Sequence, residues 1–158
     1  MTDAELLFHL EREVAAKPTS EIEGRKALAS LKDFIGPAQR RAVLDGMRGE
    51  EKQFFFDKMK ELAHIVETMP KTGETDGQGD DAIIYLHYFA GSQANFYIRE
   101  KDIGCEDSPG QHQAFGTADL FNDGGELGYI SIAEIVENRG ELDFHWRPRP
   151  WKEVKDKA

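Results

Sequence analysis

The spacing of apolar side chains changes near residue 70, from a helical period to the alternation typical of strands. Before this point, apolar residues recur every three or four positions, and capping sequences precede two of the runs. Gly36 is expected to close the second helix in a left-handed conformation, and Pro37 is expected to open the third. The pattern therefore predicts four helices, at residues 3–17, 20–35, 37–47 and 50–69.

The fourth predicted helix carries more apolar surface than one face can hold. One stripe follows steps of four and three residues and consists of Phe55, Met59, Leu62, Val66 and Met69. Phe54, Phe56 and Ile65 lie off this stripe. The helix is therefore expected to be covered on more than one side, by the sheet or by a partner. In the second helix, Ile22 is expected to belong to the buried stripe.

The second half of the chain predicts strands. Residues 82–90 (AIIYLHYFA) are apolar on both faces, which is typical of a central strand, and residues 95–101 form its antiparallel return. Residues 114–121 (AFGTADLF) and 126–131 (ELGYIS) predict a hairpin closed by the turn at residues 122–125. Its Asp-Gly-Gly sequence suits a turn that needs positive φ angles.

A short helix and a last strand are predicted to follow. Ser131 and Glu134 have capping-box spacing, which predicts a helix up to about residue 138. Residues 141–147 (ELDFHWR) alternate in polarity, with Leu142, Phe144 and Trp146 expected on one face. Proline at positions 148 and 150 is expected to prevent further pairing.

These elements predict an α+β fold: an N-terminal helical segment of about four helices, followed by an antiparallel β-sheet of about five strands with one short helix. The predicted boundaries are a helical region (1–70), a polar, glycine-rich linker (71–81), a sheet domain (82–151) and a frayed tail (152–158). Trp151 is the residue expected to anchor the tail.

Charge narrows the classes of partner. The chain of 158 residues has a formal net charge of −10. Residues 1–70 hold 13 acidic and 11 basic side chains, whereas residues 71–158 hold 17 and 9. Such a surface repels phosphate groups, so direct binding to nucleic acid or to an anionic membrane is not expected. It favours cationic proteins, including proteins that themselves bind nucleic acid.

Cysteine content and hydropathy point to a compartment. Cys105 is the only cysteine, so no intramolecular disulfide can form, which is typical of a reducing environment. No apolar run approaches the roughly 20 residues that a membrane helix needs. The sequence therefore predicts a cytoplasmic protein.

Several segments together resemble a domain family of small bacterial proteins that are frequent on conjugative plasmids, integrated elements and phages. The segments are YLHYF (85–89), FYIREKD (96–102), QHQAFGTADL (111–120), GELGYISIAEI (125–135), ELDFHWRPRP (141–150) and the helical stretch 35–62. The order AFG…DL…ELGYIS is the most specific part. The resemblance brings no particular activity, but it implies a genetic setting in which anti-restriction and other anti-defence genes are carried.

The leading hypothesis is a non-enzymatic, acidic protein-binding module without a cofactor. Its partner would be another protein, such as a host nucleic-acid-binding defence complex, as for an inhibitor of the anti-restriction or anti-CRISPR type. The contact surface is expected to use the acidic loop 102–110, the hairpin turn and exposed aromatic rings. The candidate binding residues are Phe54, Phe56, Glu106, Asp107, Asp123, Glu126 and Trp151. A homodimer is left open as an alternative assembly.

The competing hypothesis is a metal-dependent hydrolase or small-ligand-binding protein. Histidine and carboxylate side chains from different strands would converge to hold a divalent metal such as zinc. The candidate ligands are His87, His112, Asp119 and His145. Their spacing matches no established ligand motif. The two hypotheses differ in whether these side chains meet at one point or lie apart.

Overall fold

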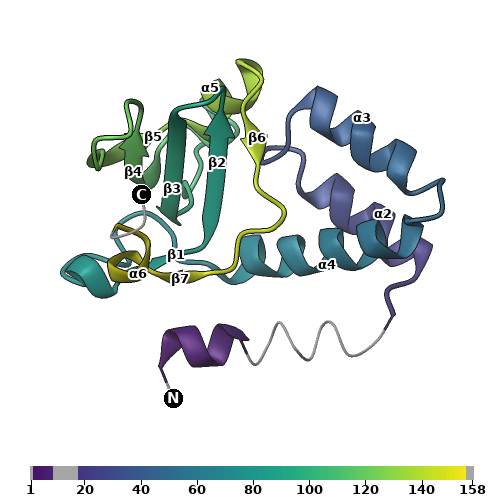
Figure 1. The fold of residues 1–158 in the computed structure, drawn as a ribbon, viewed down its shortest axis with the longest axis horizontal. Helices are drawn as coiled ribbons and strands as arrows, with labels where there is room; N and C mark the ends of the chain where they lie inside the picture. Colours follow the sequence, from purple (N-terminus) through teal and green to yellow (C-terminus); the bar gives the residue numbers. More distant parts are fainter. Residues whose placement is uncertain (1, 9–17, 156–158) are drawn as a thin grey trace.

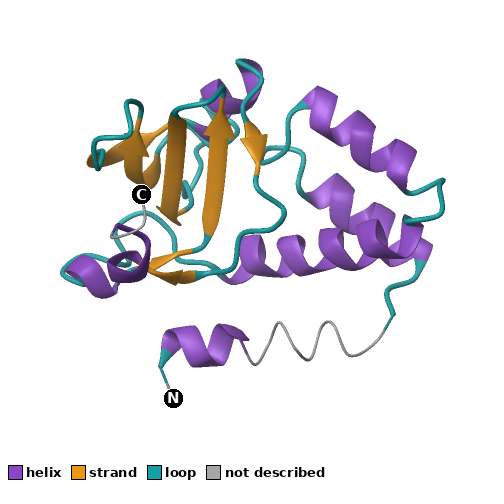
Figure 2. Ribbon diagram, in the orientation of Figure 1, coloured by secondary structure: helices purple, strands orange, loops and turns teal. Residues whose placement is uncertain are grey.

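The structure, a computed structural model, describes residues 2–8 and 18–155. It has an α+β fold, as the sequence predicts, with α2, α3 and α4 at one end and the two sheets, with α5 and α6, at the other (Figures 1 and 2). The helices are α2 (Glu21–Ser30), α3 (Pro37–Gly46), α4 (Lys52–Thr68), the 3-10 helix η1 (Gly79–Asp81), α5 (Ile132–Glu137) and α6 (Trp151–Lys155). The strands are β1 (Ile83–Ile84), β2 (Leu86–Ala90), β3 (Ala94–Glu100), β4 (Ala114–Asp119), β5 (Glu126–Ile130), β6 (Glu141–Leu142) and β7 (Arg149–Pro150).

Local capping signals locate the helix starts well. The Ser20 hydroxyl accepts a hydrogen bond from the Glu23 backbone N–H, and Pro37 is the first residue of α3. Residues 3–8 are helical, and the rest of the first predicted helix lies outside the described residues. The second helix was predicted too long: α2 ends at Ser30, and Gly36 has a φ of −71° as the N-cap of α3, so it does not close a helix.

Helix α4 is covered on more than one side, as expected. Helix α2 packs across α4, and the buried side chains of α4 belong to the same hydrophobic cluster as those of the sheet. The buried side chains of the helix are Phe56, Met59, Leu62, Ile65 and Val66. The assignment of the stripe was partly wrong, because Phe56 and Ile65 are buried whereas Phe55 is half-buried. Ile22 was also misplaced, since its side chain is 80% exposed.

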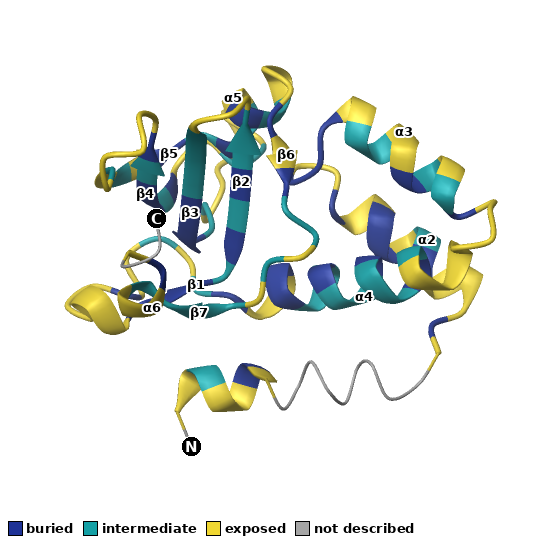
Figure 3. Cartoon of the chain, in the orientation of Figure 1, coloured by how far each residue is buried: buried dark blue, intermediate teal, exposed yellow. Residues whose placement is uncertain are grey.

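The main sheet is antiparallel, with the strand order β5-β4-β3-β2-β6. Its register places Tyr88, Phe96 and Ala118 side by side on the face that belongs to the main core. The Tyr88 hydroxyl donates to the Phe34 carbonyl oxygen, and burial raises the pKa of Tyr88 well above its usual value. One cluster of buried side chains thus joins the helical region to the sheet (Figure 3).

The opposite face carries a second, smaller cluster of side chains. Ile84, Tyr97 and Val154 form its buried part, with Trp146 and Trp151 packed against them. The C-terminal segment is therefore not frayed up to residue 155, because it forms α6. The ring of Trp151, the first residue of α6, lies against the Tyr97 ring, with centroids 5.4 Å apart. Residues 156–158 lie outside the described residues.

Two predicted strands were wrong in extent. Residues 82–90 divide at Tyr85, because β1 pairs with β7 whereas β2 pairs with β3 and β6. The last strand stops at Leu142, and Asp143 then accepts the His145 backbone N–H in a turn. As a result, Phe144 and Trp146 pack into different clusters.

Pro150 was expected to prevent further pairing, but it pairs with Ile83 in the short β1–β7 ribbon. This ribbon has only two strands, so each strand is an edge, where proline is tolerated.

The predicted linker, residues 71–81, is largely exposed, but hydrogen bonds tie it to β3. A bulge in β3 brings Arg99 and Glu100 to the same segment. The buried Glu100 carboxylate accepts the backbone N–H groups of Gly73 (2.7 Å) and Thr75 (2.9 Å). Arg99 donates Nε to Thr75 Oγ1 at 2.8 Å, and the same hydroxyl donates to Glu100. The Thr75 hydroxyl thus bridges the two buried charged side chains.

Candidate protein-interaction site

Strand β5 is an open edge of the main sheet. Its residues pair with β4 alone, and within residues 2–8 and 18–155 no other hydrogen bond reaches its backbone. Alternate residues of an edge strand turn their N–H and C=O groups away from the sheet, where they can pair with another chain. The β4–β5 hairpin lies at the end of the molecule farthest from α2 and α3 (Figure 1).

The side chains around this edge are apolar and exposed. Leu127 and Tyr129, which point to the face opposite the main core, are 58% and 69% exposed. At the hairpin tip, Phe121 is 74% exposed and Leu120 is also exposed. The pair at the tip follows directly after β4 and was predicted to continue that strand. Large apolar side chains gathered on one edge are typical of an interaction surface.

The hairpin tip is held by a buried carboxylate. Asp119, 1% exposed, accepts the backbone N–H groups of Asp123 (3.1 Å) and Gly124 (3.3 Å). Asn122, Gly124 and Gly125 have φ angles of 60°, 101° and 76°, so the predicted turn is confirmed with the left-handed residues it needs. Asp119 therefore fixes the conformation of the hairpin loop.

Acidic groups flank both ends of β5. Asp123 and Glu126 are exposed at its start. Near its end, His112 contacts Ser131 and joins the edge to the acidic loop, where Glu106 and Asp107 are exposed. The carboxylate of Asp102 organises this loop by accepting the backbone N–H groups of three residues, Gly104, His112 and Gln113.

The pKa of Asp102 reflects these contacts. Burial acts to raise the pKa of its carboxyl group, but the three backbone hydrogen bonds lower the pKa by more than burial raises it. The net result is a pKa below the usual range of aspartate, so the Asp102 carboxylate stays ionised to a lower pH than an ordinary aspartate.

The opposite edge of the sheet is closed. Strand β6 has two residues, and the side-chain amide of Gln39 from α3 covers it. Gln39 Nε2 donates to the Leu142 carbonyl oxygen at 2.8 Å, and Gln39 Oε1 accepts the Leu142 N–H at 3.0 Å. Both outward backbone groups of Leu142 are therefore satisfied within the chain, which prevents pairing with another strand.

The aromatic candidates have different positions. Phe54 is exposed on α4 and stacks on His145, with ring centroids 6.4 Å apart. Phe56 was expected at the surface, but it is 4% exposed, because α2 approaches α4 closely at Gly24. Trp151 is half-buried in the second cluster. Of these three aromatic rings, only Phe54 is an exposed contact candidate, and it lies on α4, outside the β4–β5 hairpin.

The histidines and Asp119 have separate partners. His87 Nδ1 lies 2.9 Å from Asp143 Oδ2, and its Nε2 lies 2.8 Å from Asn95 Oδ1. His112 Nε2 lies 3.1 Å from the Pro109 carbonyl oxygen. Among the described residues, no group of three or more histidine, cysteine, aspartate or glutamate side chains is placed to hold a metal ion.

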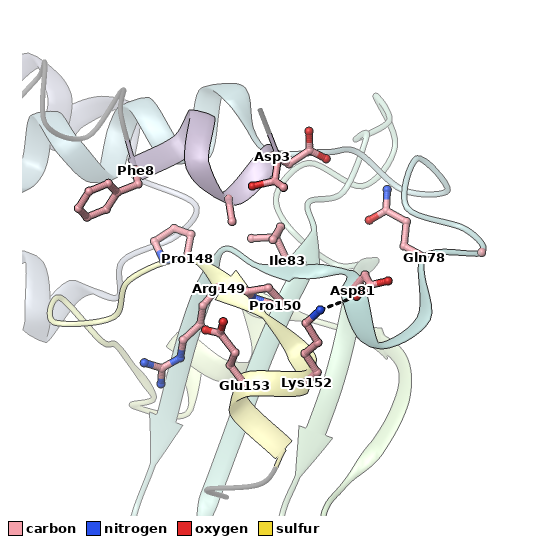
Figure 4. A pocket seen from close by; sticks show the side chains of 13 residues that line it. Asp3, Phe8, Gln78, Asp81, Ile83, Pro148, Arg149, Pro150, Lys152 and Glu153 are labelled. Atoms are coloured by element: carbon pink, nitrogen blue, oxygen red, sulfur yellow. Dashed lines mark hydrogen bonds and ion pairs between the residues drawn. The ribbon is translucent and has the colours of Figure 1, made fainter.

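A cavity of about 740 Å³ lies between helical residues 3–8, the β1–β7 ribbon and α6 (Figure 4). Charges of both signs line it, and Lys152 and Asp81 form an ion pair at 2.9 Å. Arg149 stacks over the Trp146 ring at 4.1 Å. Nearby, burial and the charge of Asp3 raise the pKa of Tyr85 to about 12. The cavity thus presents no single charge to a ligand.

Comparison of the chain with protein-family models, curated proteins and solved structures found no match. Within the part of the chain that the structure describes, no helix is both long enough and apolar enough to cross a membrane. The strand β5 together with the hairpin tip is the best-defined part of the candidate site.

Two of the predicted binding residues, Asp123 and Glu126, lie at this edge, whereas the exposed apolar residues of the same edge were not among those predicted. Leu120 and Phe121 directly precede the predicted turn, and this position could have indicated that they lie in the exposed loop and not in a buried strand. No signal in the sequence marks Leu127 and Tyr129 as exposed, because exposure depends on β5 being the last strand of the sheet.

Proposed function

We propose that this chain is a non-enzymatic protein-binding module that accepts an extended segment of another protein along β5. The observation that carries this proposal is the contrast between an open edge with exposed apolar side chains and an opposite edge closed by Gln39. In such strand addition, backbone hydrogen bonds supply affinity and alternate side chains supply specificity.

Charge complementarity defines the class of partner. Asp123 and Glu126 flank the edge, and the chain carries a net charge of −10. A second copy would bring the same negative charges to the interface, so a homodimer through β5 is disfavoured. A segment rich in lysine or arginine fits best, as found in proteins that hold nucleic acid. Nucleic acid itself would be repelled.

The resemblance to a family carried by plasmids and phages narrows this proposal. It leads us to propose a host nucleic-acid-binding complex as the partner, with the module acting as an inhibitor in the bacterial cytoplasm. The acidic edge would then compete with the phosphate backbone for a basic surface. No metal or other cofactor takes part in this function.

The test is capture from bacterial lysate with the tagged chain, followed by titration of the purified partner. Leu127→Lys with Tyr129→Lys removes two exposed apolar side chains and adds like charge toward a basic segment. Because central apolar anchors contribute about 2 kcal/mol or more each, affinity is expected to fall by roughly 100-fold or more. Ile22→Lys is the matched control, since it makes the same type of change at an exposed apolar residue of α2.

Two results would contradict the proposal. One is a partner that binds the β5 double variant and the wild type equally. The other is a preparation that carries about one metal ion per chain and captures no protein, which would turn attention to His87, His112 and His145. Salt dependence adds a further criterion, because binding to a basic segment must weaken as ionic strength rises.

A further inference from the structure

A second cavity lies on the core face of the sheet, close to the β4–β5 hairpin. It measures about 320 Å³, opens to solvent, and is lined by β2, β3, β4 and β5 on one side and α5 on the other. Phe96, Ala118, Ile130 and Ile135 form its apolar walls. Small-molecule sites in proteins have volumes of roughly 300–1,000 Å³, so this cavity is large enough for one ring or one branched side chain.

Small side chains keep the cavity open. Ala118 lies between Phe96 and Glu126 in the register of the sheet, and Ala90 lines the cavity at the end of β2. A larger apolar residue at either alanine would fill the space and add buried apolar surface. Because this space opens to solvent beside the proposed contact edge, its apolar walls are accessible to a group of a partner segment.

The rim of the cavity is negatively charged. Glu134 from α5 lines it and is exposed, and within the described residues its carboxylate has no hydrogen bond or ion pair. Glu126, directly opposite Ala118, places a second exposed carboxylate next to the same face of β4. An apolar interior below two carboxylates is complementary to an apolar group that carries a cation.

We propose that this cavity binds an aromatic or branched apolar group that carries a positive charge. Resting on the proposed function, the natural occupant is an anchor side chain of the partner segment with a lysine or arginine beside it. One fully enclosed anchor surrounded by weaker contacts is the usual arrangement of an interface hot spot. The cavity would thereby select the partner, while β5 supplies backbone pairing.

The probe is the phenethylammonium ion, and its matched control is 3-phenylpropionate, which has a similar apolar part and the opposite charge. Each is titrated into the isotopically labelled chain and followed by NMR shifts of the methyl groups of Ala90, Ala118 and Ile135. A ligand of this size is expected to bind with a Kd on the order of 1 mM. The ammonium is expected to bind two- to five-fold more tightly than the carboxylate, because the rim charges are exposed.

Variants separate the two parts of the site. Ala118→Leu fills the cavity and is expected to weaken phenethylammonium binding at least ten-fold, and Ala90→Leu does the same at the strand end if the first variant does not fold. Glu134→Gln is expected to remove most of the preference for the ammonium while leaving the binding of 3-phenylpropionate unchanged or stronger.

Three results would overturn this inference. They are the absence of shifts at these methyl groups, equal affinity for both probes, and full binding by a folded Ala118→Leu or Ala90→Leu chain. Its failure is distinguishable from failure of the proposed function. Partner capture that depends on Leu127 and Tyr129 but not on a filled cavity leaves strand addition standing. Phenethylammonium binding without such a partner leaves the cavity standing.

Discussion

The two edges of the main sheet differ in whether their outward backbone groups are covered. At β6, the strand has two residues and the Gln39 side chain satisfies both outward groups of Leu142. At β5, five residues lie open, with Leu127 and Tyr129 exposed beside them. Since an open apolar edge is an aggregation hazard that proteins usually avoid, the open edge at β5 is the feature on which the proposed binding role rests.

The largest expected effect comes from two glycines that face each other across β4 and β5. A Cβ at Gly116 would lie 1.9 Å from the Tyr97 carbonyl oxygen, whereas a Cβ at Gly128 would have nothing within 4 Å. Gly116→Ala is expected to lower the free energy of unfolding by about 3 kcal/mol through overpacking. Gly128→Ala is expected to raise it by about 0.5 kcal/mol.

Urea denaturation of both glycine variants measures this difference. Equal destabilisation by the two substitutions would show that β5 is as tightly enclosed as β4, which contradicts an open edge.

The next effect concerns the closed edge. Gln39→Ala leaves the N–H and C=O groups of the buried Leu142 without partners, which is expected to cost about 2 kcal/mol of unfolding free energy. The Leu142 amide should then exchange its hydrogen faster. Arg40→Ala, at the neighbouring position of α3, is the control and should change stability by less than about 0.5 kcal/mol. If both variants behave alike, Gln39 does not protect the β6 edge.

A smaller, pH-dependent effect distinguishes the two ends of the sheet. Because backbone hydrogen bonds lower the folded-state pKa of Asp102, its contribution is complete above the ordinary aspartate pKa of about 3.9 and is lost as the pH falls through the lowered value. Amide protection of Gly104, His112 and Gln113 should therefore fall at low pH. Leu142, held by an uncharged amide, should show no such local loss.

Hydrogen exchange measured at a series of pH values, corrected for the intrinsic rate, tests this difference. Asp102→Asn is the matched variant, since it should remove the pH dependence at these three amides. Persistence of the same transition in that variant would assign it to another group.

The smallest stability effect is expected at the proposed contact residues themselves. Leu127→Lys with Tyr129→Lys should lower the free energy of unfolding by less than about 1 kcal/mol, because both side chains are exposed in the free chain. Thermal and urea unfolding measure this change. A much larger loss would mean that the two residues support the fold, and the binding test would then need the single substitutions.

Local signals in the sequence predicted the elements but not their partners. Caps and turns depend on neighbouring residues, so Ser20, Ser131 and the hairpin glycines were located correctly. The order of strands depends on contacts between distant residues. For this reason, the break at Tyr85, the pairing of β1 with β7 and the open edge at β5 could not be predicted.

Buried polar contacts were the other gap. The glycine-rich residues 71–81 have the composition of a linker, but Glu100 and Arg99 bind Thr75 and hold that segment on β3. Charged residues are usually expected at the surface, so the sequence gives no sign that Arg99 and Glu100 are buried. Their contact with Thr75 is visible only in the structure. Likewise, nothing in the sequence around His87 indicates that its two ring nitrogens form hydrogen bonds with Asp143 and Asn95.

Hydrogen exchange of the chain alone and in complex with its captured protein tests the central claim most directly. If the partner adds a strand, the outward amides of β5 (Glu126–Ile130) should gain protection, while Leu142 in β6 remains unchanged. Protection gained elsewhere, with β5 exchanging as it does in the free chain, would contradict the account.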